Sequence, residues 1–183
     1  MKIKIDDIPE GGLQISATAA SAPWLRDIVF DVFGPDHVKD NDMARADLQL
    51  FKKNRDITVL GGVILKYHPT CDRCLRPFQK QEQVTIHQIL VPSRAHKAPA
   101  KGSETEVPDE DFGYYKDEEI NLSDVIKESI ILSQSMVNKC NQECRGLCSK
   151  CGKNLNDGPC KCKKEELGSS PFAGLKKAIS QKD

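Results

Sequence analysis

Hydrophobic and polar residues alternate along several stretches of the chain, which is the pattern of β-strands with one buried face. Two short strands are expected within residues 1–17, and the main sheet is expected over residues 46–91. In that region the chain runs into a turn that holds two cysteines and then returns, which predicts a hairpin of two long antiparallel strands. Gly61 and Gly62 interrupt the first long strand and predict a bulge or a bend.

Two other stretches have hydrophobic residues at helical spacing. The first follows Ser21, which can cap it, has Pro23 in its first turn and stops at Gly34. The second begins where either Asn121 or Ser123 can cap it, and its apolar side chains lie on one face. Both helices should pack against the sheet. The patterns therefore predict an α+β fold, with an antiparallel sheet packed with two helices.

The remaining segments show no strong periodicity. From Pro92 to Gly113 the chain is rich in prolines, alanines, lysines and acids, which predicts a mobile loop of about residues 92–113. Its negative charge most simply keeps it solvated, and mimicry of nucleic acid toward a basic partner is the alternative. A short basic helix is predicted between Ser170 and Ile179. We expect a sheet domain over residues 1–139 and a cysteine-rich module with a basic tail over residues 140–183.

All eight cysteines of the 183-residue chain occur as four close pairs. The pairs are Cys71 and Cys74, Cys140 and Cys144, Cys148 and Cys151, and Cys160 and Cys162. The sequence shows neither a signal-peptide pattern nor an apolar run long enough for a membrane span, so we expect a cytoplasmic protein. Disulfides are rare in reducing compartments, and such spacings favour zinc over a disulfide framework. Eight sulfurs make two four-cysteine sites, hence two zinc ions.

The grouping of the cysteines follows from how far each loop must close. Residues 148–162 can close locally around one ion, because the eight residues between Cys151 and Cys160 are rich in turn formers. The other four cysteines must then share the second ion and join the hairpin turn, as a zinc knuckle, to the segment after the second helix. A site that joins 71/74 with 148/151 is the alternative. His68 could replace a thiolate, but a place within the strand suits it better.

The motifs together resemble one known family. They are Cys71-x-Arg-Cys-Leu-x-Pro-Phe78, Ile120-Asn-Leu122 before a helix, and Cys140-x3-Cys-x-Gly-Leu-Cys-x2-Cys-Gly-x-Asn-Leu-Asn-x3-Cys-x-Cys162. This combination is similar to the YceD family, the large ribosomal RNA subunit accumulation proteins of bacteria and chloroplasts, over roughly residues 10–180. The resemblance implies a role in the synthesis, processing or stability of 23S ribosomal RNA. The stretch Ser133–Met136 departs from the family, which tends to have an apolar, proline-containing helix end there.

A non-catalytic role is expected, because thiolates that close both sites leave no open metal position, and the four histidines are scattered. The leading hypothesis is a factor that contacts RNA or a precursor of the large subunit through basic residues around the cysteines. These residues are Arg73, Arg76, Lys139, Arg145, Lys150, Lys153, Lys161, Lys163 and Lys164. Zero net charge and the acidic loop support a protein-binding adaptor for a large-subunit assembly protein instead. Clustered thiolates would also suit an iron–sulfur or redox protein. No membrane or small-molecule partner is expected.

Overall fold

The computed structural model of the chain describes residues 1–39, 43–93 and 112–162. The chain divides into two compact units. The first unit comprises Met1–Asp72 and Arg76–Cys140, and the second comprises Arg73–Leu75 and Asn141–Asp183. Within the described residues, the first unit contains every strand and α-helix, whereas the second contains a single 3-10 turn at Leu155–Asp157.

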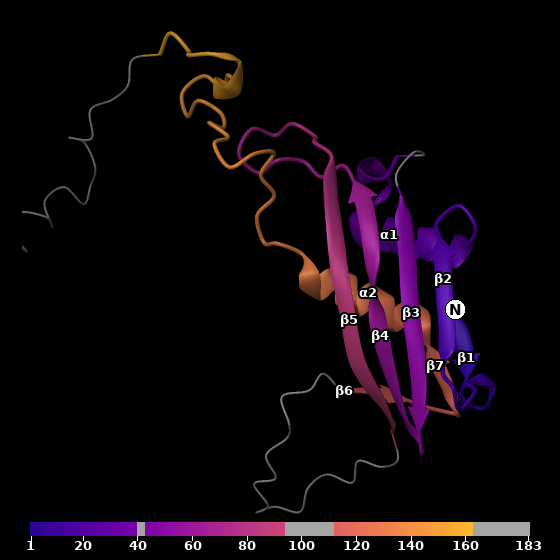
Figure 1. Ribbon diagram of the computed structural model, residues 1–183. Helices are drawn as coiled ribbons and strands as arrows, with labels where there is room; N and C mark the ends of the chain where they lie inside the picture. The colour runs from indigo at the N-terminus through magenta and orange to yellow at the C-terminus, as the bar shows by residue number, and fades with distance from the viewer. Residues whose placement is uncertain (40–42, 94–111, 163–183) are drawn as a thin grey trace, which may run out of the picture. The chain divides into compact units, whose positions relative to one another are not determined.

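A five-stranded sheet forms the centre of the first unit (Figure 1). In spatial order its strands are β2 (Leu13–Thr18), β3 (Ala44–Lys53), β4 (Asp56–Tyr67), β5 (Lys80–Pro92) and β6 (Phe112–Tyr115). The first four are antiparallel, and the expected long hairpin is formed by β4 and β5. A separate small sheet pairs β1 (Lys2–Lys4) with β7 (Glu119–Asn121).

Both predicted helices are present and lie behind the sheet in Figure 1. Helix α1 (Pro23–Phe33) buries Leu25, Ile28 and Val29, and α2 (Leu122–Ser133) buries Leu122, Val125, Ile126 and Ile130. These side chains meet the inward-facing residues of β3, β4 and β5 in one hydrophobic core. The α+β class is thereby confirmed. None of the helices in the described residues is both long enough and apolar enough to cross a membrane.

The two adjacent glycines of β4 have a different role from the predicted bulge. The pairing register passes through Gly61 and Gly62 on both sides without an inserted residue. A Cβ on Gly61 would lie 2.1 Å from the carbonyl oxygen of Asp47, and one on Gly62 would lie 2.8 Å from the carbonyl oxygen of Val84. Glycine is therefore required here because neighbouring backbones approach closely. Of the two predicted alternatives, a bulge or a bend, the bulge was wrong.

The sheet is not antiparallel throughout, because β6 runs parallel to β5. The expected loop is also shorter than predicted at its ends, since Pro92 belongs to β5 and Gly113 to β6. Residues 94–111 and the predicted tail helix at 170–179 lie outside the described residues.

The predicted helix caps need correction. Ala22 is the N-cap residue of α1, and the Ser21 hydroxyl instead lies 2.9 Å from the hydroxyl of Thr18. Asn121 does stand at the N-cap of α2, but its side chain makes no capping hydrogen bond. The side-chain amide of Asn121 donates to the Asp124 carboxylate at 2.7 Å, so it binds a side chain in the first turn of α2 and not a backbone N–H group.

Candidate metal centres

The turn between β4 and β5, which we call the hairpin turn (residues 68–79), places two thiols in the interior. The Cys71 amide donates to the carbonyl of Arg76 at 2.9 Å, and Thr70 pairs with Pro77 in a short bridge. Cys71 is fully buried and Cys74 is 3% exposed. The strands that run into this turn thus hold both thiols in a protected position.

The segment that follows α2 is bound to the same turn by two hydrogen bonds between Asp72 and Asn138. The Asp72 amide donates to the carbonyl of Asn138 at 2.9 Å, and the Asn138 amide donates to the Asp72 carboxylate at 2.6 Å. Two residues farther on, the Cys140 amide donates to the sulfur of Cys71 at 3.4 Å. An N–H group aimed at sulfur favours the thiolate form, which is the form that binds a metal ion.

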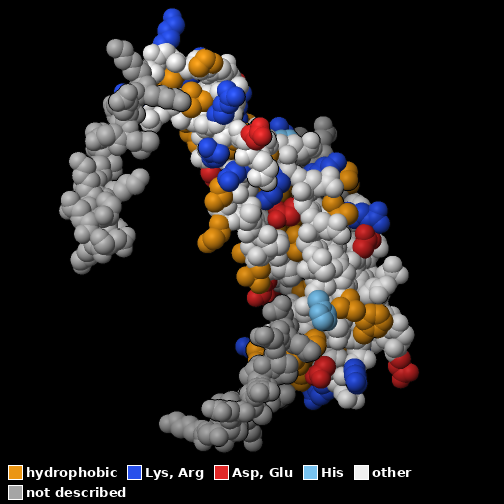
Figure 2. Space-filling view, turned by 60° about the vertical axis from the view of Figure 1, so that its left-hand side comes forward, with side chains coloured by type: hydrophobic (Ala, Val, Ile, Leu, Met, Phe, Trp, Pro, Cys, Tyr) orange, Lys and Arg blue, Asp and Glu red, His pale blue; other side chains and the backbone are white. Residues whose placement is uncertain are grey.

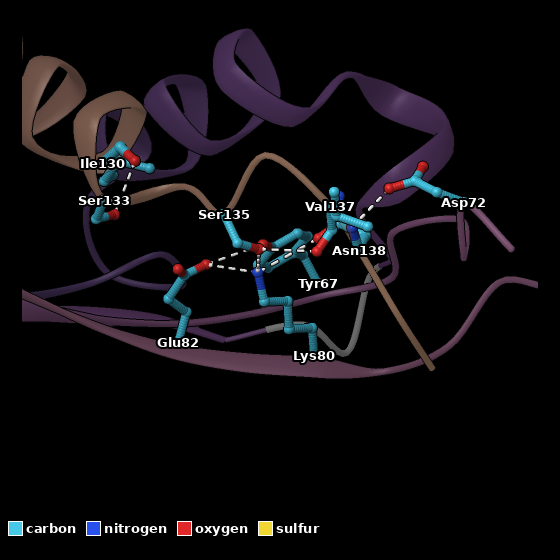
Figure 3. Close-up of polar contacts among 9 residues, drawn as sticks. All are labelled: Tyr67, Asp72, Lys80, Glu82, Ile130, Ser133, Ser135, Val137 and Asn138. Carbon is cyan, nitrogen blue, oxygen red and sulfur yellow. Dashed lines mark hydrogen bonds and ion pairs between the residues drawn. The ribbon is translucent and has the colours of Figure 1, made fainter. Parts of the chain in front are cut away.

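Lys80, the first residue of β5, holds the path from α2 to Cys140 (Figure 3). Its ammonium group donates to the Ser135 hydroxyl at 3.2 Å and to the Asn138 side-chain oxygen at 3.4 Å. It also lies 3.4 Å from the Glu82 carboxylate, which accepts a hydrogen bond from the Tyr67 hydroxyl at 2.9 Å. The stretch that leaves α2 is therefore held by hydrogen bonds to a residue of the sheet.

Tyr67 is the member of this network that lies in the hydrophobic core. Its ring stacks on Phe33 with a centroid distance of 3.9 Å, and its side chain is almost fully buried. Burial, assisted by the hydrogen bond to Glu82, raises the pKa of the Tyr67 hydroxyl far above its ordinary value. The hydroxyl therefore stays neutral and donates to Glu82.

The second unit builds its own cysteine turn from residues 148–153. The Gly152 amide donates to the carbonyl of Cys148 at 2.9 Å, and the Cys148 amide donates to the carbonyl of Lys153, also at 2.9 Å. Gly152 has φ +68°, and Leu75, at the same position after the second cysteine of the hairpin turn, has φ +58°. The two Cys-x2-Cys turns thus share one backbone feature, with glycine in one and a strained leucine in the other.

The thiols of Cys148, in this turn, and of Cys162, later in the chain, have opposite pKa shifts. Backbone N–H groups of Cys151 and Lys150 aim at the sulfur of Cys148 and lower the pKa of its thiol to about 6. The hydrogen bond with Cys151 raises the pKa of the Cys162 thiol to about 12. Closely packed thiolates repel one another, so without a cation some of these thiols stay protonated when others ionise. A divalent cation would balance four thiolates here.

The structure gathers the eight cysteines into two groups of four, each of which could hold a metal ion. Within each group the sulfur atoms lie within 4.8 Å of one another. We call Cys71, Cys74, Cys140 and Cys144 the hairpin group, and Cys148, Cys151, Cys160 and Cys162 the C-terminal group. Zinc–sulfur bonds of about 2.3 Å in a tetrahedron would separate the sulfurs by about 3.8 Å, so both groups fit such an ion. The grouping is the one that local loop closure predicts, and His68 belongs to neither group.

Sequence reasoning missed Asn156, which it treated only as a turn former. The Asn156 side-chain oxygen accepts from the Arg145 amide at 2.8 Å, and its nitrogen donates to the sulfur of Cys144 at 3.4 Å. Asn154 in turn accepts from the Asn156 amide at 2.9 Å. The Asn-x-Asn spacing just after a Cys-x2-Cys turn was the available signal. Asn156 thus connects the 3-10 turn of the second unit to a cysteine of the hairpin group.

Gly146 is a second residue whose role was not predicted. It has φ +71°, and a Cβ at this position would lie 2.9 Å from the carbonyl oxygen of Arg73. The adjacent Leu147 amide donates to that same carbonyl at 3.0 Å. The glycine therefore allows the backbone before Cys148 to approach the tip of the hairpin turn.

Seven of the nine predicted RNA-contacting residues lie in the described residues, and all seven are exposed. Lys163 and Lys164 lie outside the described residues. The described part of the second unit carries five cations against two acids; the cations are Arg73, Arg145, Lys150, Lys153 and Lys161, and the acids are Glu143 and Asp157. On the first unit, the face shown in Figure 2 carries charges of both signs, scattered among uncharged side chains. The second unit is thus the more basic of the two.

A family model matches the region that contains the cysteines. The model described as large ribosomal RNA subunit accumulation protein YceD matches residues 61–177, which include both cysteine groups. The chain belongs to the YceD family. The match begins at β4, so it covers less of the N-terminal part than the resemblance predicted.

Two plant relatives of this YceD-family chain carry the family's descriptive name. The chain is 36% identical over 67 residues to the chloroplastic large ribosomal RNA subunit accumulation protein YCED homolog 1 of Arabidopsis thaliana, which covers 36% of the chain and 21% of that protein. It is 41% identical over 61 residues to the protein of the same name from Zea mays, covering 32% of the chain and 21% of the relative.

A bacterial relative matches a longer part of the chain. An uncharacterized protein of Mycobacterium leprae is 26% identical over 109 residues, covering 60% of the chain and 48% of that protein. The chain therefore spans from about a fifth to about half of the length of these curated relatives. No solved structure gives a significant match to it.

Proposed function

We propose that the chain is a non-catalytic zinc-binding factor for the synthesis, processing or stability of 23S ribosomal RNA, and thereby for assembly of the large ribosomal subunit. The observation that carries the proposal is the pair of four-cysteine groups within the region that the family model matches. Family members are named for accumulation of this RNA, and that name describes no enzyme activity. The proposed role places the chain in the compartment where large subunits are assembled.

Zinc is proposed for both groups because of their donor chemistry. Four thiolates per site complete the tetrahedral shell of a structural zinc ion and leave no open position for a catalytic water. When bound, zinc would supply a cross-link between chain segments rather than a reaction. N–H groups directed at Cys71 and Cys148 favour the thiolates that zinc needs.

Contact with RNA is proposed for the basic second unit. Its exposed lysines and arginines can neutralise phosphates, and each neutralised phosphate releases a counterion. The described part of this unit contains no aromatic residue for stacking, so phosphate and shape contacts are favoured over readout of bases.

Metal analysis tests the first part of this proposal. Chain purified without added metal should contain two zinc ions per chain and should be colourless. Iron with visible absorbance would reject the zinc proposal and favour the iron–sulfur alternative. Absence of any bound metal would reject both.

Binding to large-subunit RNA over a salt series tests the second part. The matched variants are Lys150→Gln with Lys161→Gln in the second unit, and Lys4→Gln with Lys53→Gln in the first unit, all at exposed positions. The slope of the log of the RNA-binding constant against the log of the salt concentration should become about two units less negative in the second-unit double variant only. The reason is that each phosphate contact contributes about one unit. Equal slopes in both pairs would exclude this surface as the RNA contact.

An adaptor that binds protein without touching RNA is the competing function. It predicts a complex with a large-subunit assembly protein whose stability barely changes with salt, together with no measurable RNA binding. In cells, loss of the chain should lower 23S relative to 16S ribosomal RNA under either function. The salt series therefore separates the two functions.

A further inference from the structure

One edge of the main sheet is only partly covered in the described residues. On one side, β5 pairs with β4 from Lys80 to Leu90. On its other side β6 pairs with Ile89–Pro92 alone, at the lower end of β5 in Figure 1. No described strand pairs with residues 81–88 on that side. Unpaired strand edges present backbone donors and acceptors that can pair with another chain.

Two hollows follow the seam between this edge and helix α2. One has a volume of about 410 Å³ and lies by β6, β7 and the start of α2. The other, of about 430 Å³, lies farther along the same helix by Ser129 and Ser133. Gln88 and Glu128 line both, so the hollows form one continuous groove. We call this the α2–β5 groove. It lies beside the side of β5 on which residues 81–88 have no described partner strand, which we call the free edge.

Two residues that line the groove have side-chain oxygens without a partner in the described part of the chain. Gln88 and Asn121 both line the first hollow, and within the described residues their side-chain oxygens are buried and have no hydrogen-bond partner. Both atoms are acceptors. Buried acceptors without donors cost free energy, and a donor from a bound molecule would remove that cost.

The charge of the groove specifies which donors would suit it. The first hollow is lined by four carboxylates, those of Asp117, Glu119, Asp124 and Glu128, against the ammonium groups of Lys2 and Lys116. Glu119 is neutralised by Lys2 at 2.9 Å. The Glu128 carboxylate has no ion pair or hydrogen bond within the described part of the chain, and this residue lines both hollows. The groove is therefore acidic where the two hollows meet.

We propose that the α2–β5 groove binds an extended basic peptide segment of a partner protein. The segment adds a strand to the free edge of β5 and places an arginine or lysine side chain against Glu128 and beside Gln88. Strand addition supplies affinity through the main chain, and the groove selects positively charged side chains. RNA is disfavoured by the carboxylates, and a second copy would bring an equally acidic groove to the same edge. The inference does not depend on whether the cysteine groups bind zinc.

The experiment measures fluorescence anisotropy of a labelled peptide of alternating arginine and valine, titrated with the full chain at physiological ionic strength. A second peptide has the same sequence but carries N-methyl groups on alternate amides, which removes donors to the strand edge without changing its charge. We expect saturable binding of the first peptide and at least about tenfold weaker binding of the second, as for the loss of two or more backbone hydrogen bonds.

Three variants locate the contact. Glu128→Gln should weaken binding about tenfold, whereas the control Glu10→Gln removes an exposed carboxylate outside the groove and should leave it unchanged. Gln88→Leu should also weaken binding. The melting temperature of the Gln88→Leu variant should be equal to or above that of the wild type. The reason is that the substitution removes a buried acceptor that has no partner among the described residues. Weaker binding together with undiminished stability identifies a binding residue rather than a structural one.

Several results would overturn the proposal. Absence of saturable binding would do so, as would equal affinity of the two peptides or of the Glu128→Gln and Glu10→Gln variants, since these indicate non-specific attraction. If single-stranded RNA displaces the peptide, and if the Gln88→Leu variant binds that RNA more weakly than the wild type does, the groove would be assigned to nucleic acid. A dimer that the peptide dissociates would assign the edge to a second copy of the chain.

Discussion

If zinc binds both cysteine groups as proposed, its removal should destabilise the first unit through the hairpin group alone. Cys140 follows Cys74 by 66 positions, so an ion shared by them closes a long loop. By the chain-entropy relation for cross-links, closing a loop of that length stabilises the folded state by about 4 kcal/mol. Cys160 follows Cys151 by 9 positions, and the corresponding loop contributes about 2.5 kcal/mol to the second unit only.

Urea unfolding followed by tryptophan fluorescence measures this difference. Trp24 is the single tryptophan and lies in α1, packed against the core of the first unit, so its signal reports that unit. With a slope of about 2 kcal/mol/M, adding a strong zinc chelator to the wild type should lower the Trp24 midpoint by about 2 M. The chelator, rather than mutation, isolates the contribution of the metal ion.

The matched variants are Cys71→Ser with Cys74→Ser and Cys160→Ser with Cys162→Ser. In the first pair the chelator should have no further effect on the Trp24 midpoint, because the long loop is already open. In the second pair it should still lower the midpoint by about 2 M. The reasoning is refuted if the chelator leaves the wild-type Trp24 transition unchanged, or if it shifts both variants equally.

Three other predictions concern the framework around these sites. Leu75→Gly should raise the free energy of unfolding by about 1 kcal/mol, because Leu75 is 62% exposed and has positive φ; an unchanged urea midpoint would contradict this. Gly61→Ala should lower the free energy of unfolding by at least about 2 kcal/mol, since its Cβ would meet the Asp47 carbonyl oxygen at 2.1 Å; a melt like the wild type would exclude that contact. Because the folded-state pKa of Tyr67 is raised, its contribution to stability is complete below the unfolded pKa of about 10 and declines as pH rises above it. Tyr67→Phe should reduce stability by about 1 kcal/mol at neutral pH through loss of the Glu82 hydrogen bond, and should flatten the alkaline decline; parallel pH profiles would refute this.

The elements that were predicted correctly are those specified by neighbouring residues. Helical spacing located α1 and α2, and alternation located the strands of the hairpin. The errors came from backbone contacts between distant segments. Gly61 is required by a neighbouring strand, and the α1 cap is Ala22 because Ser21 bonds with Thr18. The pattern of hydrophobic and polar residues within one segment cannot predict contacts with a distant segment.

The sequence by itself determined the α+β class, the grouping of the cysteines and the family. These follow from periodicity within one element and from the length of chain between two ligands, which limits which loops close easily. Only the tertiary structure decided that β6 is parallel to β5 and that Lys80 holds the path from α2 to Cys140. It also decided that the side-chain oxygen of Gln88 is buried without a partner among the described residues. The physical reason is that strand order and side-chain environment depend on packing between segments far apart in the chain, which no local pattern specifies.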